Sequence, residues 1–560
     1  MPAAAPNPAQ WLADLMASQR SLLPSSEPAE SATAWAGFPA DVMTPWLQAA
    51  NAFTQWQQQA LQQMTSPWAG ARPDDRRFAG EAWQSGPLFD AMSRAYLNQS
   101  ELVQKTLAAA PLDQRSKGQW AFVLRQVVDA LSPANALVTN PEALHAAVES
   151  GGASLAEGMK LFLQDLAKGR VSMSDDTAFE VGRNVATTPG HVVFENELLQ
   201  LIQYTPTTAR VHGRPLLIVP PCINKFYILD LQPDNSFVGH AVAQGHTVFL
   251  VSWRNVGPDQ QRLGWDDYLE QGVMQAIDVA LSISGADQLN TLGFCVGGTL
   301  LASTLAVMAA KKQDKVASMT LLTTMLDFGD TGELGLLLSE QSVASQEAAI
   351  GQGGLMKGKE LAQVFAALRA NDLIWPYVVN SYLKGKAPAA FDLLFWNADD
   401  SNLPGPMFCW YLRNTYLENK LREPGATVQC GVPVDLGAIE VPAFLYASRE
   451  DHIVPWQTAY ASTQLLGGDV SFVLGGSGHI AGVINPPAKK KRNHWVGDVK
   501  ADAGAWLAGA SDVPGSWWPR WIDWLGPHAG AMVAAPKSPG SRRYAPIEPA
   551  PGRYVKAKAP

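Results

Sequence analysis

The sequence predicts an α/β protein with a doubly wound, mostly parallel sheet, preceded by an all-helical N-terminal domain. One observation is a series of short apolar runs, at residues 216–219, 247–252, 289–293, 319–323, 441–446 and 470–474. Another is the helical pattern between these runs, for example at 266–281 and 297–312. Strands and helices that alternate at this interval indicate parallel βαβ units with helices on both faces of one sheet.

The N-terminal domain is predicted from helical periodicity over residues 85–170. One helix carries apolar residues at helical spacing, at Trp120, Val123, Leu124, Val127 and Leu131. A second helix is expected to open at Ser154, with Glu157 completing a capping box, and to close near Gly169. The polar segment that ends at residue 176 marks the end of this domain.

The domain organisation follows from these patterns. We predict a helical domain over 1–176, whose first 80 or so residues, with only loose helical stretches such as 45–64, are loosely ordered. An α/β domain follows over 177–560. Within it, residues 326–432 lack a strand rhythm and are rich in helix and aromatics. We expect them to form a cap over the C-terminal edge of the sheet, where ligands bind in open α/β sheets.

The composition argues against several classes of protein. A chain of 560 residues is too long for one compact core, and a net charge of −9 argues against bulk affinity for nucleic acid. No window holds 18 consecutive apolar residues, and no basic leader precedes an apolar run, so neither a transmembrane segment nor a signal peptide is expected. The 19 tryptophans indicate either core packing or an apolar substrate surface.

The chain has four cysteines, Cys222, Cys295, Cys409 and Cys430. Their spacing matches no zinc or redox motif, and they are too few for a disulfide scaffold in a chain of this size. A reduced, cytoplasmic protein is the simplest interpretation.

Cys295 lies in the segment Gly-Phe-Cys-Val-Gly-Gly at 293–298, which joins an expected strand to an expected helix. This is the frame of the nucleophile elbow Gly-x-Ser-x-Gly, with cysteine in place of serine. The glycines let sheet and helix approach closely, and the helix N-terminus favours a thiolate because its dipole stabilises negative charge. A merely buried, apolar cysteine would not account for three glycines at these positions.

A histidine and an acid follow the last two expected strands. His479 lies on a glycine-rich loop after 470–474, and Asp451 follows 441–446. The order nucleophile, acid, histidine is that of the α/β-hydrolase fold. We therefore predict a catalytic triad of Cys295, Asp451 and His479 on an α/β-hydrolase fold with a helical cap insertion.

Other residues in the same segments are weaker candidates. Glu450 and His452 flank Asp451, and Asp327 follows an earlier strand as an alternative acid. The basic run Lys489–Arg492 could meet a phosphate-bearing substrate, although such a run in a loop is usually solvated. We base no prediction on it.

Acyl transfer also needs donors for an oxyanion. One is expected to be the backbone N–H of Val296, the residue after the nucleophile. The other should come from the loop after the first apolar run, where Pro220 and Pro221 have no N–H to give. Cys222 and Ile223 both remain candidates.

A cysteine in this elbow favours acyl transfer over hydrolysis. A thiolate is more nucleophilic than a hydroxyl at neutral pH, and the thioester that it forms keeps most of the acyl activation. When the cysteine attacks a thioester substrate, one thioester replaces another at little change in free energy. Transfer of the acyl group from the cysteine to a hydroxyl acceptor then forms an oxoester and is favourable. The sequence thus favours an acyltransferase that draws on an acyl-CoA or a similar thioester.

Several long stretches resemble the class I polyhydroxyalkanoate synthases, the type that works without a partner subunit. In chain order they are Leu131–Ala143, Pro220–Leu231, Thr247–Asn255, Gly293–Gly298, Phe391–Leu421, Arg449–Trp456, Gly478–Pro487 and the ending PGRYVKAKA. The resemblance covers nearly the whole chain after about residue 80, and the triad positions show no departure from it.

The resemblance implies a mechanism and a setting. Cys295 takes the acyl group from (R)-3-hydroxyacyl-CoA, with 3-hydroxybutyryl-CoA as the expected substrate, and His479 removes the thiol proton. The 3-hydroxyl of a bound acyl unit then extends a growing polyester chain, while Asp451 either orients His479 or helps to activate that hydroxyl. The family implies no metal or prosthetic group. It implies a cytoplasmic homodimer at the surface of a polymer granule.

Two other functions have distinct signatures. A thioesterase or polyester depolymerase on the same fold would release free acid rather than polymer. A non-catalytic granule-associated protein would tolerate Cys295→Ala without loss of polymer in cells. The intact set of Cys295, Asp451 and His479 favours the synthase.

Overall fold

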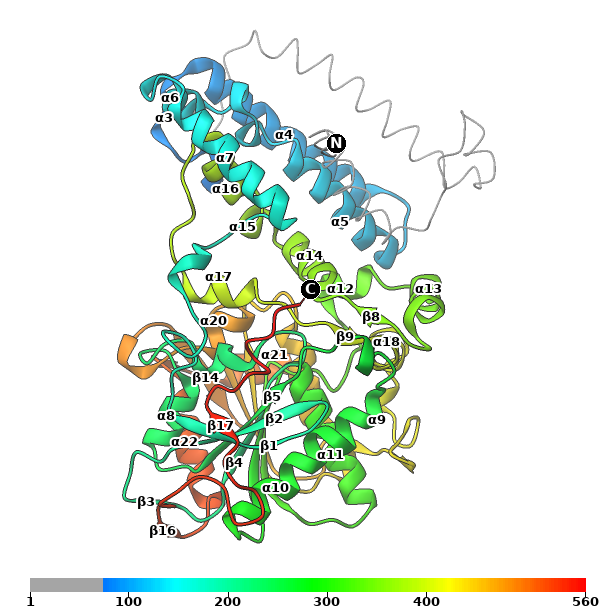
Figure 1. The fold of residues 1–560 in the computed structure, drawn as a ribbon. Helices are drawn as coiled ribbons and strands as arrows, with labels where there is room; N and C mark the ends of the chain where they lie inside the picture. Colours follow the sequence, from blue (N-terminus) through cyan, green and yellow to red (C-terminus); the bar gives the residue numbers. More distant parts are fainter. Residues whose placement is uncertain (1–73, 560) are drawn as a thin grey trace. The chain divides into compact units, whose positions relative to one another are not determined.

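The computed structural model describes residues 74–559 (Figure 1). The expectation of loose order in the first 80 residues, with a helical stretch at 45–64, lies almost wholly outside this range. Among the described residues, no helix combines the length and the apolar character needed to cross a bilayer.

The chain divides into two compact units. The helical unit takes the described residues up to Met173 together with Phe365–Ala389, and the sheet unit takes Ser174–Val364 and the chain from Ala390 onward. The segment Phe365–Ala389, called the strap below, falls within the expected cap insertion in sequence but groups with the N-terminal helices. The chain therefore passes between the units after residues 173, 364 and 389.

The helical unit combines N-terminal helices with the short helices of the strap. Its elements are η1 (Arg76–Phe78), α3 (Glu81–Ser85), α4 (Pro87–Ala109), α5 (Gln114–Ala130), η2 (Pro133–Asn135), η3 (Leu137–Thr139), α6 (Pro141–Glu149), α7 (Ala153–Lys168), α15 (Ala370–Leu373), α16 (Trp375–Tyr377) and η8 (Val378–Leu383). As predicted, α7 closes at Gly169, which adopts a left-handed backbone with φ 65°. The predicted capping box of Ser154 and Glu157 is wrong, because the Ser150 hydroxyl accepts the N–H of Ser154 instead.

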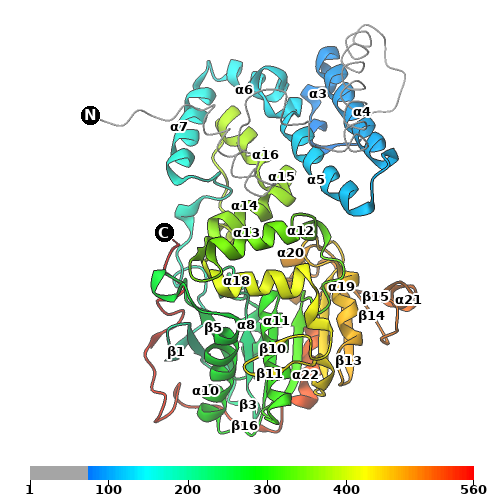
Figure 2. The same cartoon turned by 90° about the vertical axis from the view of Figure 1, so that its right-hand side faces the viewer.

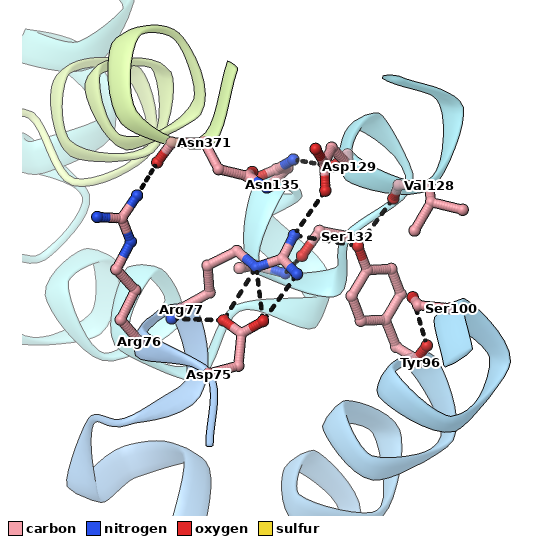
Figure 3. A network of polar contacts seen from close by, with 11 residues as sticks. Asp75, Arg76, Arg77, Tyr96, Ser100, Val128, Asp129, Ser132, Asn135 and Asn371 are labelled. Atoms are coloured by element: carbon pink, nitrogen blue, oxygen red, sulfur yellow. Dashed lines mark hydrogen bonds and ion pairs between the residues drawn. The ribbon is translucent and has the colours of Figure 1, made fainter. Parts of the chain in front are cut away.

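A network of polar contacts joins the start of the described chain to α5 (Figure 3). The guanidinium of Arg77 donates to Asp129 Oδ1 at 3.2 Å and to the hydroxyl of Tyr96 at 3.1 Å. The neighbouring Arg76 donates to the carbonyl oxygen of Asn371, in the strap, at 2.7 Å. Two adjacent arginines thus bind the N-terminal helices on one side and the strap on the other.

The strap packs closely on α7. A Cβ at Gly158 would lie 2.1 Å from the carbonyl oxygen of Tyr382, so only glycine fits at this point of the helix. The Tyr382 ring meets Phe162 edge to face at 5.4 Å, and its hydroxyl donates to Asp165 Oδ2 at 2.7 Å. Lys384 forms an ion pair with Glu142 of α6. These contacts explain why the strap groups with helices that lie far from it in sequence.

The sheet unit is built on an 11-stranded sheet in the described part of the chain. The strands, from one edge to the other, are β15 (Ser511–Pro514), β14 (Asn493–Gly497), β13 (Val470–Gly475), β12 (Ala443–Ser448), β7 (Val316–Leu322), β6 (Leu289–Phe294), β4 (Leu216–Val219), β5 (Val248–Trp253), β2 (Leu199–Tyr204), β1 (Gly190–Glu195) and β17 (Glu548–Pro549). The six strands from β13 to β5 pair in parallel and correspond to the six predicted runs. The outer strands pair antiparallel and were not predicted.

Side chains alternate between two cores, one on each face of the sheet. On β4, Leu217 and Val219 belong to one core, whereas Leu216 and Ile218 belong to the other. The first core also takes side chains of α10 (Gln275–Ser284) and α11 (Val296–Ala310), and the second takes side chains of α8 (Phe237–Ala243) and α22 (Trp518–Leu525) (Figure 1). Burial on both faces explains why these strands read as continuous apolar runs.

Several of the largest buried side chains are tryptophans, which favours the core-packing interpretation of their number. Those exposed by less than 2% are Trp83, Trp265, Trp506, Trp517, Trp518 and Trp521. Trp517 Nε1 and Trp518 Nε1 donate to the carbonyl oxygens of Gly482 and Val483 at 3.1 and 2.9 Å. Both carbonyls belong to the short helix α20 (His479–Val483), so these tryptophans fix the helix that begins at His479.

The insertion between β7 and β12 is mainly helical, as predicted. In the sheet unit it contributes α12 (Gly332–Leu336), α13 (Glu340–Ile350), α17 (Asp392–Asn397), α18 (Gly405–Tyr411) and η9 (Leu412–Leu417), and α14 (Gly358–Leu368) leads into the strap. α13 and α18 lie side by side (Figure 2). Arg413 of η9, which directly follows α18, forms ion pairs with Glu340 at 3.0 Å and with Glu347 at 2.5 Å, both on α13.

Candidate active site

Cys295 occupies a strained turn between β6 and α11. Its backbone has φ 52° and ψ −128°, a conformation that costs a residue with a side chain of the order of 1–3 kcal/mol. The turn is held because the Cys295 N–H donates to the carbonyl oxygen of Leu322 at 2.9 Å, and the Thr324 hydroxyl donates to the Cys295 carbonyl oxygen at 3.1 Å. The helix begins at the next residue, Val296. This geometry presents the thiol at the carboxyl end of the central strands.

The glycines of this turn leave no room for side chains. A Cβ at Gly297 would lie 2.3 Å from the carbonyl oxygen of Val219 on β4. At Gly298 it would lie 2.1 Å from Thr324 Oγ1, and at Gly293 it would lie 2.4 Å from the Cα of Gly298. Each contact is shorter than a Cβ tolerates, so helix and sheet reach this separation only with glycine.

The structure brings Asp451 and His479 together at the ends of β12 and β13. His479 Nδ1 lies 2.6 Å from Asp451 Oδ2, and both side chains are buried. The other carboxylate oxygen, Oδ1, accepts the backbone N–H groups of Ile453 and Val454 at 2.9 Å each. The Cys295 side chain is near enough to His479 to contribute to the shift of its pKa. Because Nδ1 faces the carboxylate, Nε2 is the ring nitrogen left for the thiol.

The electrostatics of this cluster favour a protonated imidazole. Burial by itself lowers the pKa of His479, but the Asp451 carboxylate and the interaction with Cys295 outweigh it and raise the pKa to about 10. Phe294 stacks on the imidazole with ring centroids 5.7 Å apart. A histidine in this setting readily holds the proton that a neighbouring thiol gives up.

The candidate oxyanion donors come from the residue after the nucleophile and from the loop that follows β4. Among the described residues, the backbone N–H groups of Val296, Cys222 and Ile223 donate to no backbone acceptor in a turn, loop or helix cap. Trp253 Nε1 donates to the carbonyl oxygen of Pro220 at 2.8 Å and so holds the loop that carries Cys222 and Ile223. Both of these residues stay candidates for the second donor. Burial, with Cys295 close by, raises the pKa of the Cys222 thiol to about 12.

The alternative acids lie elsewhere. Asp327 accepts from Asn419 Nδ2 at 2.8 Å and forms an ion pair with Arg422 at 3.0 Å. Glu450 is exposed, and His452 is half-buried beside the triad acid. His479 therefore takes Asp451 as its carboxylate partner.

The basic run 489–492 is exposed, and three of its side chains line a cavity of about 530 Å³. The cavity is also lined by Ala481 and Ile484, next to the helix that begins at His479. Lys489 lies 3.5 Å from Asp234, which lines the same cavity. The run is thus close to the site in space, which the sequence alone did not indicate.

Two tyrosines of the insertion, Tyr411 and Tyr416, interact with each other and with the nucleophile. Burial raises the pKa of both, and the nearby Cys295 adds to each shift, whereas the contact between them raises the pKa of Tyr411 and lowers that of Tyr416. Their rings meet edge to face at 5.5 Å. They lie in a stretch that the sequence marked as aromatic-rich and as part of the resemblance, but no spacing rule connects them to Cys295.

The fold and the site together define an α/β-hydrolase-fold protein with a cysteine, a histidine and an aspartate in the positions of a catalytic triad. Residues 211–486 match the α/β-hydrolase fold family, and residues 74–241 match the N-terminal family of poly-beta-hydroxybutyrate polymerase (PhaC). The chain belongs to the poly(3-hydroxyalkanoate) polymerase family. This confirms the resemblance found in the sequence.

Two curated relatives illustrate the relationship. The poly(3-hydroxyalkanoate) polymerase subunit PhaC of Cupriavidus necator is 56% identical over 493 residues, which is 87% of this chain and 83% of the relative. The protein of the same name from Rhizobium meliloti is 42% identical, over 88% of this chain and 81% of the relative. Among solved structures, a monoacylglycerol lipase of Paleococcus ferrophilus is similar at 12% identity and a TM-score of 0.35, covering 59% of this chain and 99% of the lipase.

Proposed function

We propose that this protein polymerises (R)-3-hydroxyacyl-CoA into a polyester with release of CoA, through an acyl thioester on Cys295. The observation that carries the proposal is the strained cysteine at the elbow, near a histidine that Asp451 holds through Nδ1. A serine at this turn would pass an acyl group to water in most enzymes of this fold. A cysteine instead forms a thioester that keeps the group activated for a hydroxyl acceptor.

In the first step His479 Nε2 takes the thiol proton, and the Cys295 sulfur attacks the thioester carbonyl of the substrate. The oxyanion is stabilised by the N–H of Val296 and by a second N–H, from Cys222 or Ile223. The carbon–sulfur bond to CoA then breaks, and the departing CoA sulfur takes the proton from His479. The products are free CoA and an acyl group bound to Cys295 as a thioester.

In the second step the 3-hydroxyl of another acyl unit attacks a thioester carbonyl and gives up its proton to a base. An oxoester forms, the sulfur leaves as thiolate, and the chain grows by one unit. We assign the removal of the thiol proton to His479, because its interaction with Cys295 contributes to its raised pKa. Asp451 either keeps the ring of His479 in this tautomer or helps to activate the hydroxyl, and both roles agree with its 2.6 Å contact to Nδ1.

The proposal includes the setting of the reaction. We propose 3-hydroxybutyryl-CoA as the substrate, and we propose that the side chains named above act without a metal or prosthetic group. We also propose that the protein works as a cytoplasmic homodimer at the surface of the polymer granule. The family membership supports this setting.

The test is to incubate the purified protein with (R)-3-hydroxybutyryl-CoA and to follow free CoA and the acyl product together. Cys295→Ala is the test variant, and Cys430→Ala, at a half-buried cysteine that contacts Asp266, is the matched control. We expect CoA release and ester-linked polymer in the wild type and the control, and neither in Cys295→Ala. Free 3-hydroxybutyrate in place of polymer would make the protein a thioesterase.

A further inference from the structure

The loop that follows β4 carries the candidates for the second oxyanion donor, and a distant segment holds it. The N–H of Ser401 donates to the carbonyl oxygen of Ile223 at 3.1 Å. Asn224 pairs with Asp400 in an isolated antiparallel bridge. The position of this loop relative to Cys295 therefore depends on how residues 399–401 are themselves held.

A buried lysine lies directly after the same loop. Lys225 is only 2% exposed, and its ammonium group donates to the carbonyl oxygen of Ala557 at 2.7 Å. The Trp396 indole donates to the backbone carbonyl oxygen of Lys225 at 2.6 Å. In Figure 1 the last residues of the chain run from β17 to the marked C-terminus. Ala557 thus contacts Lys225, the residue that directly follows the loop.

Asp399 supplies the negative charge of this cluster. Its carboxylate is 2% exposed, accepts the Tyr227 hydroxyl at 2.9 Å and forms an ion pair with Lys558 at 2.9 Å. Burial lowers the pKa of Lys225 to about 8, and the attraction of Asp399 opposes that shift. A buried charge is costly unless it is paired and hydrogen-bonded, so removing one partner disturbs the others.

We propose that Lys225 and Asp399, together with the C-terminal residues Ala557 and Lys558, form a lock that positions the loop 220–224 for oxyanion binding. The proposal rests on the acyl-transfer reaction proposed above. None of the four residues contacts the reacting atoms in this assignment. They are positioning residues that act through the backbone of the loop.

The test compares two reactions of the same sulfur. Transfer of an acyl group from the CoA thioester needs the oxyanion donors, whereas alkylation of Cys295 by iodoacetamide displaces iodide at a saturated carbon and forms no oxyanion. Loss of one donor costs an acyl-transfer enzyme about 10²–10³-fold in rate. We expect Lys225→Met to lower CoA release about 10-fold or more, because the loop is displaced rather than removed. Alkylation, followed on the Cys295 peptide by mass spectrometry, is expected to keep the wild-type rate.

Two further variants keep the test decisive if Lys225→Met fails to fold. Lys558→Met removes a mostly exposed side chain and is expected to lower CoA release in the same selective way, by a smaller factor than Lys225→Met. Lys556→Met, an exposed lysine on the same tail, is the matched control and is expected to leave both rates unchanged. If Lys225→Met does not fold, the comparison of Lys558→Met with Lys556→Met decides the question.

Equal losses of CoA release and of alkylation in Lys225→Met and Lys558→Met would overturn the proposal, because the cysteine itself would then be disturbed. Unchanged CoA release in both variants would overturn it as well. A wild-type protein that yields free hydroxy acid would refute polymerisation but not the lock, since hydrolysis of the thioester needs the same oxyanion donors.

Discussion

Replacing Gly298 by alanine tests how tightly the nucleophile turn is packed. The new Cβ would lie 2.1 Å from Thr324 Oγ1 and 2.8 Å from its Cγ2, whereas ordinary contact begins at 3.4 Å. Thr324 must therefore retreat by about 1.3 Å, and its hydroxyl then loses the 3.1 Å hydrogen bonds to the carbonyl oxygens of Cys295 and Leu322. The added methyl group thus acts directly on the residue that carries the thiol.

How much stability and rate each substitution costs depends on whether the new Cβ meets a side chain or the backbone. Overpacking of this kind costs about 1–3 kcal/mol of stability, and a shift of about 1 Å at a reacting group costs about 10²-fold in rate. Gly297→Ala should be more severe, because its Cβ would meet the backbone carbonyl oxygens of Val219 and Pro220 at 2.3 and 2.5 Å. Backbone atoms cannot rotate away as the Thr324 side chain can.

The assay pairs urea unfolding with CoA release from the thioester substrate. Gly298→Ala is expected to lose both stability and rate, and a second substitution, Thr324→Ala, is expected to restore part of the stability because it removes Oγ1 and Cγ2. Gly526→Ala, where a Cβ would meet nothing within 4 Å, is the control and should behave like the wild type. The reasoning is refuted if Gly297→Ala proves milder than Gly298→Ala, or if Gly298→Ala matches the wild type.

Three further predictions follow from the buried groups. Burial lowers the pKa of His479, but Asp451 and Cys295 outweigh burial and raise it from the ordinary 6.5 to about 10. The protonated histidine therefore stabilises the folded protein fully below pH 6.5, and this contribution is lost as the pH rises through about 10. The free energy of unfolding, measured by urea titration across this window, should fall more steeply in the wild type than in Asp451→Asn; equal slopes would contradict the coupling. Trp521→Ala opens a cavity in the core and removes an indole hydrogen bond to Thr320. Urea titration should therefore show that the free energy of unfolding falls by about 3–5 kcal/mol. A fall of less than about 1 kcal/mol would show that Trp521 is not a main contributor to the core. Cys222→Ala should keep CoA release within about twofold of the wild type, because burial keeps this thiol protonated, and complete inactivity would assign it a direct role.

The parallel core of the sheet was predictable because burial on both faces makes each strand a continuous apolar run. The six predicted runs lie within three residues of the observed strand ends. The edge strand β15 escaped prediction for the opposite reason, since it reads Ser-Asp-Val-Pro and is largely exposed. An edge strand with mixed polarity has no periodic signal to detect.

The candidate site was predictable to the extent that its residues follow strands. Cys295, Asp451 and His479 each lie within five residues of the end of an apolar run, and glycines mark the turns that carry the cysteine and the histidine. The closeness of Tyr411 to Cys295 and the packing of the strap on the N-terminal helices could not be predicted in this way, because the partners are distant in sequence. Asp165 and Tyr382, for example, are 217 positions apart, and no local pattern reports such a contact.

The strap has a consequence for any attempt to divide the protein. A chain shortened to begin after Met173 would retain the strap but lose its partners in the N-terminal helices. Tyr382 would lose its hydrogen bond to Asp165 and its ring contact with Phe162, and Lys384 would lose its ion pair with Glu142. Val379 and Ser381, buried in the intact unit, would lose the helices that cover them. The helical unit therefore cannot be removed by cutting the chain once, because part of it, the strap, is an internal segment of the chain that lies between two parts of the sheet unit in sequence.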